Sequence, residues 1–279
     1  MKNIFKKIVT MLWAFSYGNL MSFMASKDKK LLEKNLELHN KYKNKRIFIF
    51  FTGRSIQDID FSKFKDEYVM GVNFLALDSR FKELNAEFYC YATNWDASWA
   101  KLAAFGLHEI YQAINMNVKL ILNASSKYWI NNLDIFGNLE DGEKFKNNIY
   151  FINNTAFIPD GRSEVACGIK KNGKTTGGIL PRSINIAIDL GFKDIYLIGA
   201  DYSKNPLRVG HFYGSTDFIA KRSLEEEEIN LGIRNFAKKQ DVNIINVIEK
   251  DQTSFGFDSI FLEEVYSNCL LNETSKGCE

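Results

Sequence analysis

The chain has 279 residues, of which 46% are hydrophobic and 25% charged, so it is long enough to bury a substantial core and has the composition of a soluble globular protein. Its 36 basic and 34 acidic residues give a formal net charge of only +2, and this balance argues against nucleic-acid binding. The four cysteines form no CxxC pair and have no histidine nearby, which argues against a zinc site and favours free thiols in a reducing compartment.

Residues 1–27 differ from the rest of the chain. Lys2, Lys6 and Lys7 precede an uncharged, aromatic-rich run from Ile8 to Ala25. A cleaved signal peptide, a membrane-spanning helix and a helix packed on the protein or on a partner are all compatible with this pattern. Polar residues in the run weaken the spanning helix, and lysines beside aromatic residues are typical of a helix lying on a membrane surface. We therefore expect a membrane-surface helix here.

Short apolar runs alternate with helical patterns between residues 46 and 249. The continuous apolar run that ends at Phe51 is typical of a central parallel strand covered on both faces. The pattern predicts an α/β fold with a single doubly wound, mostly parallel sheet in one domain, 28–268, followed by a flexible tail, 269–279. An irregular segment, 128–160, predicts a lid-like insertion. Strands are expected over 46–51, 68–72, 87–92, 118–122, 148–152, 194–199 and 242–247, and helices over 27–45, 95–107, 179–190 and 218–239.

Small polar residues follow the first three predicted strands: Thr52, Asn73, and Thr93 or Asn94. Such residues make turns and cap helices without any other role. At one edge of a sheet they would also form a hydrogen-bonding rim for a nucleobase and a ribose, and the two uses are compatible.

The turn after the first strand reads Thr52-Gly53-Arg54-Ser55, and Thr52 or Ser55 is expected to cap a short helix. A glycine turn between a strand and a helix is a common geometry for binding nucleotide phosphates. With a single glycine, however, the turn matches neither the dinucleotide-binding motif nor the P-loop.

The stretch 174–217 carries the strongest functional signal. A turn of small residues, 175–178, opens a predicted helix whose N-terminus offers unpaired N–H groups to an anion. Asp201 lies just past the carboxyl end of a predicted strand, where open α/β sheets bind ligands. We expect this half of the chain to hold an anionic, nucleotide-linked substrate.

His211 is the candidate general base among the three histidines. It lies in a glycine-flanked polar loop just after Asp201, and an imidazole titrates near neutral pH. A loop histidine bonded only to backbone is the alternative. His39 and His108 lie in or at the end of predicted helices, where structural or exposed positions are expected.

Metal and cofactor motifs are missing from the sequence. It contains no serine nucleophile elbow, no cysteine–histidine pairing and no HExxH. Asp58-Ile59-Asp60 has the spacing of a metal-binding DxD, but it falls in the helix after the first turn, so we expect it to face solvent or to cap. A metal-independent mechanism without a cofactor is therefore expected.

Several of these motifs, in this order, resemble one protein family. IFIFFTGRSIQDIDFSKF, the strand ending in VNF, TTGG followed by IAIDLGFKDIYLIGADY, and VGHFYGSTD are similar to the bacterial sialyltransferases that decorate lipooligosaccharide, and to the wider group that includes flagellin motility accessory factors. The resemblance spans roughly residues 46–250. It implies a variant of the nucleotide-sugar transferase fold.

The resemblance also implies residue roles. A histidine in a GH loop is the family's general base, which corresponds to His211. Thr52 stands where asparagine is usual, Arg54 where proline is common, and Ser203 where a phosphate-binding tyrosine is expected, for which Tyr202 or Tyr213 could substitute. The donor-binding residues expected, from the resemblance and, for Asn94, from the rim of polar residues at the strand ends, are Thr52, Gly53, Ser55, Asn73, Asn94, Thr175, Thr176, Gly177, Asp201, Tyr202, Ser203 and Tyr213.

The expected function is a metal-independent, inverting glycosyltransferase that moves sialic acid or a related nonulosonic acid from a CMP donor to a lipid-linked or surface glycan of a bacterium, as in lipopolysaccharide or capsule synthesis. It would lie in the cytoplasm, peripherally at the inner face of the inner membrane, and a homo-oligomer is compatible with the sequence. The alternatives are a pyrophosphokinase acting on a pterin-like substrate and a non-catalytic, nucleotide-binding component of polysaccharide assembly.

Overall fold

The computed structural model describes residues 29–91, 110, 113–114, 117–127, 147–153, 156–159, 178–220 and 224–271. The segment 1–27, the expected helix 95–107 and most of the expected insertion 128–160 lie outside these ranges. Within the described ranges, no helix combines the length and the hydropathy that crossing a bilayer requires.

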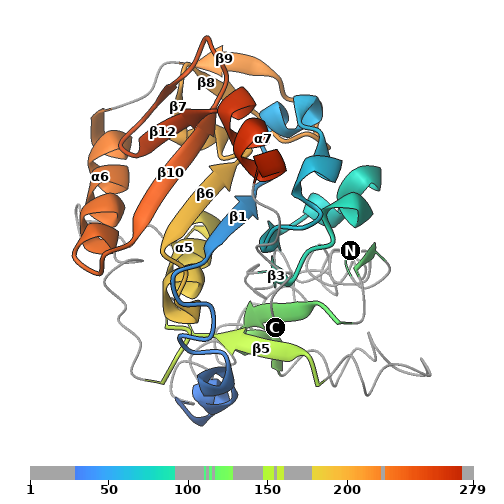
Figure 1. The fold of residues 1–279 in the computed structure, drawn as a ribbon, viewed down its shortest axis with the longest axis vertical. Coiled ribbons are helices and arrows are strands. Elements are labelled where there is room, and N and C mark those ends of the chain that lie inside the picture. Colours follow the sequence, from blue (N-terminus) through green and yellow to red (C-terminus); the bar gives the residue numbers. More distant parts are fainter. Residues whose placement is uncertain are drawn as a thin grey trace, which may run out of the picture.

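An eight-stranded sheet forms the centre of the molecule, in the order β12-β10-β6-β1-β2-β3-β4-β5, and every neighbouring pair is parallel (Figure 1). The predicted parallel sheet is confirmed, including each of its predicted strands. The strands are β1 (Arg46–Phe50), β2 (Val69–Val72), β3 (Phe88–Tyr91), β4 (Lys119–Asn123), β5 (Ile149–Ile152), β6 (Asp194–Ile198), β10 (Asn243–Ile248) and β12 (Asp258–Phe261).

The direction of winding reverses at β1. From β1 the chain builds outward through β2, β3, β4 and β5, and then returns to place β6 on the other side of β1, followed by β10 and β12. This is the doubly wound topology that the sequence predicts. The carboxyl ends of β1 and β6 therefore flank the switch point, where open α/β sheets have their binding crevice.

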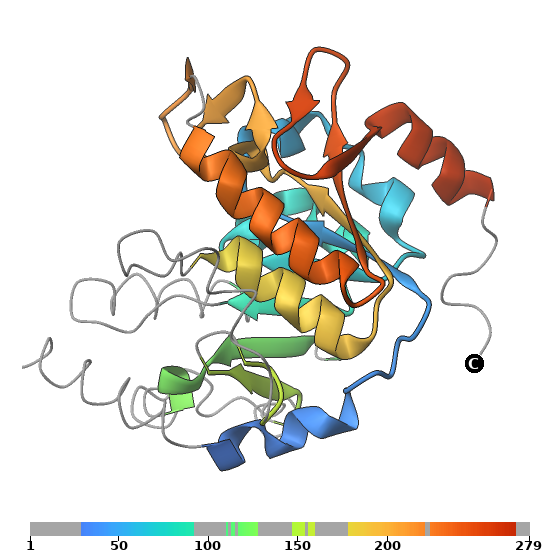
Figure 2. The same cartoon turned by 90° about the vertical axis from the view of Figure 1, so that its left-hand side faces the viewer.

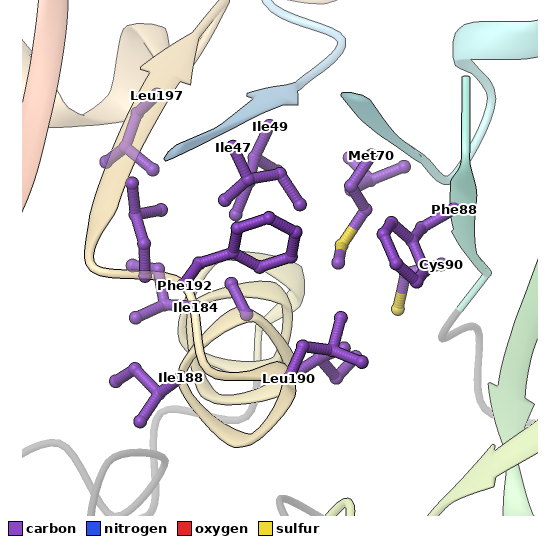
Figure 3. Packing of buried hydrophobic residues seen from close by; sticks show 14 of the residues in the cluster. Ile47, Ile49, Met70, Phe88, Cys90, Ile184, Ile188, Leu190, Phe192 and Leu197 are labelled. Atoms are coloured by element: carbon purple, nitrogen blue, oxygen red, sulfur yellow. The ribbon is translucent and has the colours of Figure 1, made fainter. Parts of the chain in front are cut away.

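Alternate residues of each strand enter opposite layers of the core. Ile47 and Ile49 face α5 (Ile179–Leu190) and α6 (Leu224–Lys238), which cover one face of the sheet, whereas Phe48 and Phe50 face the other layer. Figure 2 shows α5 and α6 on the same face, and Figure 3 shows the side chains of α5 packed beneath β1, β2 and β6. Because both faces are covered, the central strands β1, β2 and β3 are buried along almost their whole length.

Short 3-10 helices and α7 (Leu262–Leu271) cover the second face. The 3-10 helices of the described chain are η1 (Lys29–Glu37), η2 (Arg54–Asp58), η3 (Phe61–Phe64), η4 (Leu75–Leu77), η5 (Ser79–Leu84), η6 (Ala124–Ser126) and η7 (Asp201–Ser203). Two small antiparallel ribbons join β7 (Lys204–Asn205) to β11 (Thr253–Ser254) and β8 (Leu207–Val209) to β9 (Phe218–Ala220).

Two predicted boundaries and one predicted helix cap were wrong. The helix expected from residue 218 begins at Leu224, because Phe218–Ala220 pairs with β8 and its backbone is extended. Helix α7 continues to Leu271, beyond the point where a flexible tail was expected. The turn after β1 has no side-chain cap: η2 begins after Gly53, whose missing side chain cannot accept a hydrogen bond.

Asp60 caps η3, as expected, by accepting a hydrogen bond from the Ser62 amide at 3.1 Å. This bond and the one from the Ser62 hydroxyl satisfy donors at the start of the helix. Capping therefore accounts for Asp60, whereas Asp58 is exposed and lies 4.0 Å from Arg208.

A partly buried carboxyl group lies near the end of α5. Burial raises the pKa of Asp189 to about 7, against an ordinary value of 3.8, and a hydrogen bond from the Phe157 amide opposes this shift. Between these two pH values the folded chain holds a proton that the unfolded chain has released. The free energy of unfolding therefore falls as the pH rises from about 4 to about 7.

Replacing this group with an amide, Asp189→Asn, should remove that loss. We expect the variant and the wild type to be similar in stability near pH 4.5, and the variant to be more stable by about 2–4 kcal/mol at pH 8. Urea unfolding at a series of pH values measures the difference. Asp251→Asn, at an exposed residue, is the control and should keep the wild-type pH dependence. An Asp189→Asn curve parallel to the wild type would contradict the assignment.

Candidate functional site

A cavity of about 220 Å³ lies at the switch point of the sheet. Three segments line it: the turn after β1, the first residues of α5, and the turn after β6 with η7. His211, from the loop after β8, completes the lining. The lining residues are Phe51, Thr52, Gly53, Gly178, Ile179, Leu180, Gly199, Ala200, Asp201, Tyr202, Ser203 and His211.

The turns after β1 and β6 are in direct backbone contact. The Gly53 amide donates to the Gly199 oxygen at 3.0 Å. A Cβ on Gly53 would lie 2.4 Å from that oxygen and 2.5 Å from Cγ of Asp201. Gly199 has φ of +68°, and a Cβ there would lie 2.2 Å from Ile56. Glycine is therefore required at both positions. At Gly53 the reason is the close approach of neighbouring atoms, and at Gly199 it is close approach together with the positive φ.

Asp201 is 1% exposed and joins the two turns through its carboxylate. One oxygen accepts the Ser55 amide at 3.0 Å, and the other accepts the Ser55 hydroxyl. Lys204 lies 3.5 Å from the same carboxylate and donates to the Ser55 hydroxyl at 3.1 Å. Burial lowers the pKa of Lys204, and the negative charge of Asp201 opposes the shift. Asp201, Ser55 and Lys204 thus form a buried ionic cluster that fixes the turns.

His211 lies against Thr52. Its Nδ1 is 3.0 Å from the Thr52 hydroxyl oxygen and 3.3 Å from the Thr52 backbone oxygen, and its backbone forms a bridge with Gly53. The ring of Tyr213 is stacked on the imidazole, with centroids 5.1 Å apart and an interplanar angle of 7°. The Tyr202 ring lies 6.4 Å away at a tilt. The candidate base is therefore held at the wall of the cavity between aromatic rings.

Arg54 ties the loop that carries His211 to the turn after β1. Its guanidinium donates to the Thr216 oxygen at 3.0 Å and 3.2 Å, and also to the Gly214 oxygen. Gly210 has φ of +125°, and a Cβ there would lie 2.0 Å from the Thr216 oxygen, so the loop turns back closely on itself. Arg54 was noted from the sequence only as a departure from the family pattern, and its position beside Gly53 was the available signal.

Ser203 and Asn73 are placed differently from the residues above. Ser203 is fully buried; its hydroxyl donates to the Ala200 oxygen at 2.6 Å and accepts from Asn246 at 2.9 Å. Asn73 follows β2 with φ of +48° and is not among the lining residues. Its side-chain oxygen has no hydrogen-bond partner among the described residues. Phe74 connects this turn to the loop of His211 by an edge contact with Tyr213.

The structure brings together Thr52, Gly53, Ser55, Asp201, Tyr202, Ser203, His211 and Tyr213 from the predicted set. Asn94, Thr175, Thr176 and Gly177 lie outside the described residues. The next residue, Gly178, is described and begins α5, whose N-terminal N–H groups have no partner within the helix and suit an anion. Sequence reasoning missed Lys204, because no periodicity or motif marks a lysine that the fold buries.

No family model matches the chain, and no curated protein does either. Among solved structures, the chain is similar to the sialyltransferase CstII from Campylobacter jejuni, described in complex with a substrate analogue, cytidine-5'-monophosphate. The two are 16% identical, with a TM-score of 0.40, over 73% of this chain and 80% of that one. Residue roles in this chain therefore rest on its own geometry.

The ionic cluster gives a stability test. Lys204→Met leaves the Asp201 carboxylate buried without its cation, and we expect a loss of about 3–5 kcal/mol in the free energy of unfolding. Adding Asp201→Asn removes the stranded charge and should restore about 1 kcal/mol or more. Urea unfolding of the single and double variants measures both effects.

Lys193→Met is the matched control, because Lys193 pairs with Asp241 at the surface, 2.9 Å away, where water screens the charges. It should cost far less than Lys204→Met. Equal losses in the two variants would show that burial of the Lys204 pair carries no special energy.

Proposed function

We propose that the protein is a glycosyltransferase that moves an acidic nonulosonic sugar, such as sialic acid, from a CMP donor to a bacterial surface glycan. The observation that carries the proposal is the position of His211, at the wall of the switch-point cavity and in contact with the first-strand turn. The ordered motifs of the sequence support the same function, since they resemble those of lipooligosaccharide sialyltransferases.

His211 would act as the general base. Its Nδ1 is occupied by Thr52, so Nε2 would remove the proton from the acceptor hydroxyl. The acceptor oxygen then forms a bond to the anomeric carbon, while the bond from that carbon to the phosphate oxygen breaks and the electron pair leaves with CMP. Attack from the face opposite the leaving group inverts the configuration, through an oxocarbenium-like transition state. The sugar's carboxylate suits the N–H groups at the start of α5.

The geometry distinguishes among the residues proposed to receive the departing phosphate. Tyr202 and Tyr213 are 46% and 44% exposed, so their hydroxyls can reach a ligand. The Ser203 hydroxyl already donates its proton to Ala200, so it cannot donate to a phosphate. We therefore assign the phosphate to the tyrosines, where donors aimed at developing charge lower the barrier.

Asp201 supports the donor site indirectly in this proposal. Both of its carboxylate oxygens are occupied by Ser55, and Lys204 lies beside them. Its role is to hold the two turns against each other, so that the Thr52-Gly53 backbone can border the donor. The Ser55 amide and hydroxyl are likewise engaged within the protein.

The acceptor and the location follow from the sequence pattern alone. The basic and aromatic segment 1–27 would hold the enzyme peripherally at the inner face of the inner membrane, beside a lipid-linked acceptor.

Replacing the base is the direct test. His211→Gln should lower the rate of sugar transfer at least about a hundredfold, because the acceptor hydroxyl loses its proton acceptor. CMP binding should persist: at one hundred times its dissociation constant, CMP should stabilise either protein by about 2.7 kcal/mol in a thermal-shift measurement. Transfer at a near-normal rate by the variant would remove His211 from the role of base.

His39→Gln is the matched control. His39 contacts the backbone oxygen of Asp189, near the opposite end of α5 from the cavity, so this variant should transfer sugar at the wild-type rate.

Transfer that survives a metal chelator would favour the glycosyltransferase, whereas activity that needs ATP and magnesium would indicate the pyrophosphokinase. CMP binding without any donor turnover would indicate the non-catalytic component.

A further inference from the structure

Among the described residues, the imidazole of His211 has two hydrogen-bond partners, and both are oxygen atoms of Thr52. Nδ1 lies 3.0 Å from the hydroxyl oxygen and 3.3 Å from the backbone oxygen of this residue. Among the described residues, no hydrogen bond of Nε2 is found with a group of the site. The two ring nitrogens are therefore distinguished by the protein before any ligand binds.

Both oxygens of Thr52 bear on which nitrogen carries the proton. A carbonyl oxygen can only accept, so it is favourable beside Nδ1–H and unfavourable beside the lone pair of an unprotonated Nδ1. The hydroxyl oxygen of Thr52 can accept from the same N–H. The arrangement therefore stabilises the neutral imidazole in which Nδ1 is protonated and Nε2 is the basic atom.

Tyr213 offers an acceptor for the proton of the Thr52 hydroxyl. Tyr213 forms a hydrogen bond with the Thr52 side chain, and this bond opposes the rise that burial causes in the pKa of Tyr213. If Thr52 donates to the phenol oxygen, its own oxygen is left to accept from Nδ1. The three groups then form one directional chain, from His211 through Thr52 to Tyr213.

Aromatic packing holds the imidazole of His211 in the orientation that this series of hydrogen bonds requires. The Tyr213 ring is stacked nearly parallel to the imidazole, with an interplanar angle of 7°. Phe74 and Phe212 pack edge-on against Tyr213. The amide of Phe212 also donates to the Thr52 backbone oxygen at 3.1 Å. A flip of the imidazole would place Cδ2 instead of Nδ1 beside Thr52, and it would have to separate these stacked rings.

We propose that Thr52 is a positioning residue that fixes His211 in the tautomer with Nδ1 protonated, and so presents Nε2 as the base; this deepens the proposed function and rests on it for its catalytic meaning. Thr52 acts through His211 in this role. This role depends on the turn of this chain, in which threonine is the second residue after the end of β1.

Nitrogen-15 NMR of the imidazoles tests the proposal without any substrate. The chain has three histidines, and the His211→Gln variant identifies the signals of His211. In the wild type at a pH where the ring is neutral, we expect the long-range proton–nitrogen pattern of an Nδ1–H tautomer. A wild-type pattern with the proton on Nε2 overturns the proposal, and this result needs no other variant.

The variants separate the hydroxyl from the packing. Thr52→Val keeps the shape of the side chain and should give a mixture of tautomers, whereas Thr52→Ser keeps the hydroxyl and should retain the Nδ1–H form. An Nδ1–H form that persists unchanged in Thr52→Val would overturn the role of the hydroxyl.

Transfer kinetics distinguish failure of this inference from failure of the proposed function. Thr52→Val should lower kcat by the factor by which the NMR spectrum shows the Nδ1–H form depleted, about twofold for an equal mixture, because only that form has Nε2 free to act as the base; Thr52→Ser should recover part of the loss. If the wild type transfers sugar but carries the proton on Nε2 in its resting state, the proposed function stands and the inference about Thr52 is overturned. The expected tautomer without any transfer activity would remove the proposed function and leave the hydrogen-bond geometry in place.

Discussion

The contact between the turns after β1 and β6 is the constraint on which the site depends. Gly53 and Gly199 let the two backbones meet, and the Asp201 carboxylate lies where any side chain on Gly53 would have to be. Burying that carboxylate is costly unless its oxygens are satisfied, and Ser55 and Lys204 satisfy them. The cluster therefore holds the carboxyl ends of β1 and β6 at a fixed distance from each other.

The loop of His211 is built onto this foundation. Thr52 contacts the imidazole from the first turn, while Arg54, two residues later, holds the carbonyl groups of the same loop. The two ends of one short turn thus fix His211 and its supporting loop together. The aromatic rings of Phe74, Phe212 and Tyr213 fill the space beside them. The His211 side chain is therefore positioned by backbone contacts, by the charged Arg54 and by aromatic packing.

The sequence was informative where the physics is local. Buried parallel strands need apolar residues on both faces, so the runs that became β1 to β6 and β10 could be predicted, and with them the edge at which Asp201 and Thr52 lie. Strand β12 has half of its residues exposed, and it has no apolar run to reveal it. Phe218–Ala220 is extended because β8 pairs with it, and helical spacing in the sequence carries no information about that pairing.

The interactions missed from the sequence are those between distant segments. Lys204 is an ordinary polar-loop lysine until the fold buries it beside Asp201. Arg54 likewise gains its meaning from two carbonyl groups of a remote loop. Ser203 looked like a ligand-binding residue, but its hydroxyl is used by Ala200 and Asn246.

The separation of these contacts along the chain has a consequence for biosynthesis. Thr52 and His211 are 159 residues apart, and Ser55 and Asp201 are 146 apart. During translation, β1 to β5 leave the ribosome first and can pair among themselves, with the β6 edge of β1 still uncovered. Contacts of such long range form slowly. The switch-point cavity is therefore not assembled until the second half of the chain has closed against β1, because a translation product that ends before β6 has Thr52 and Ser55 but lacks Asp201 and His211.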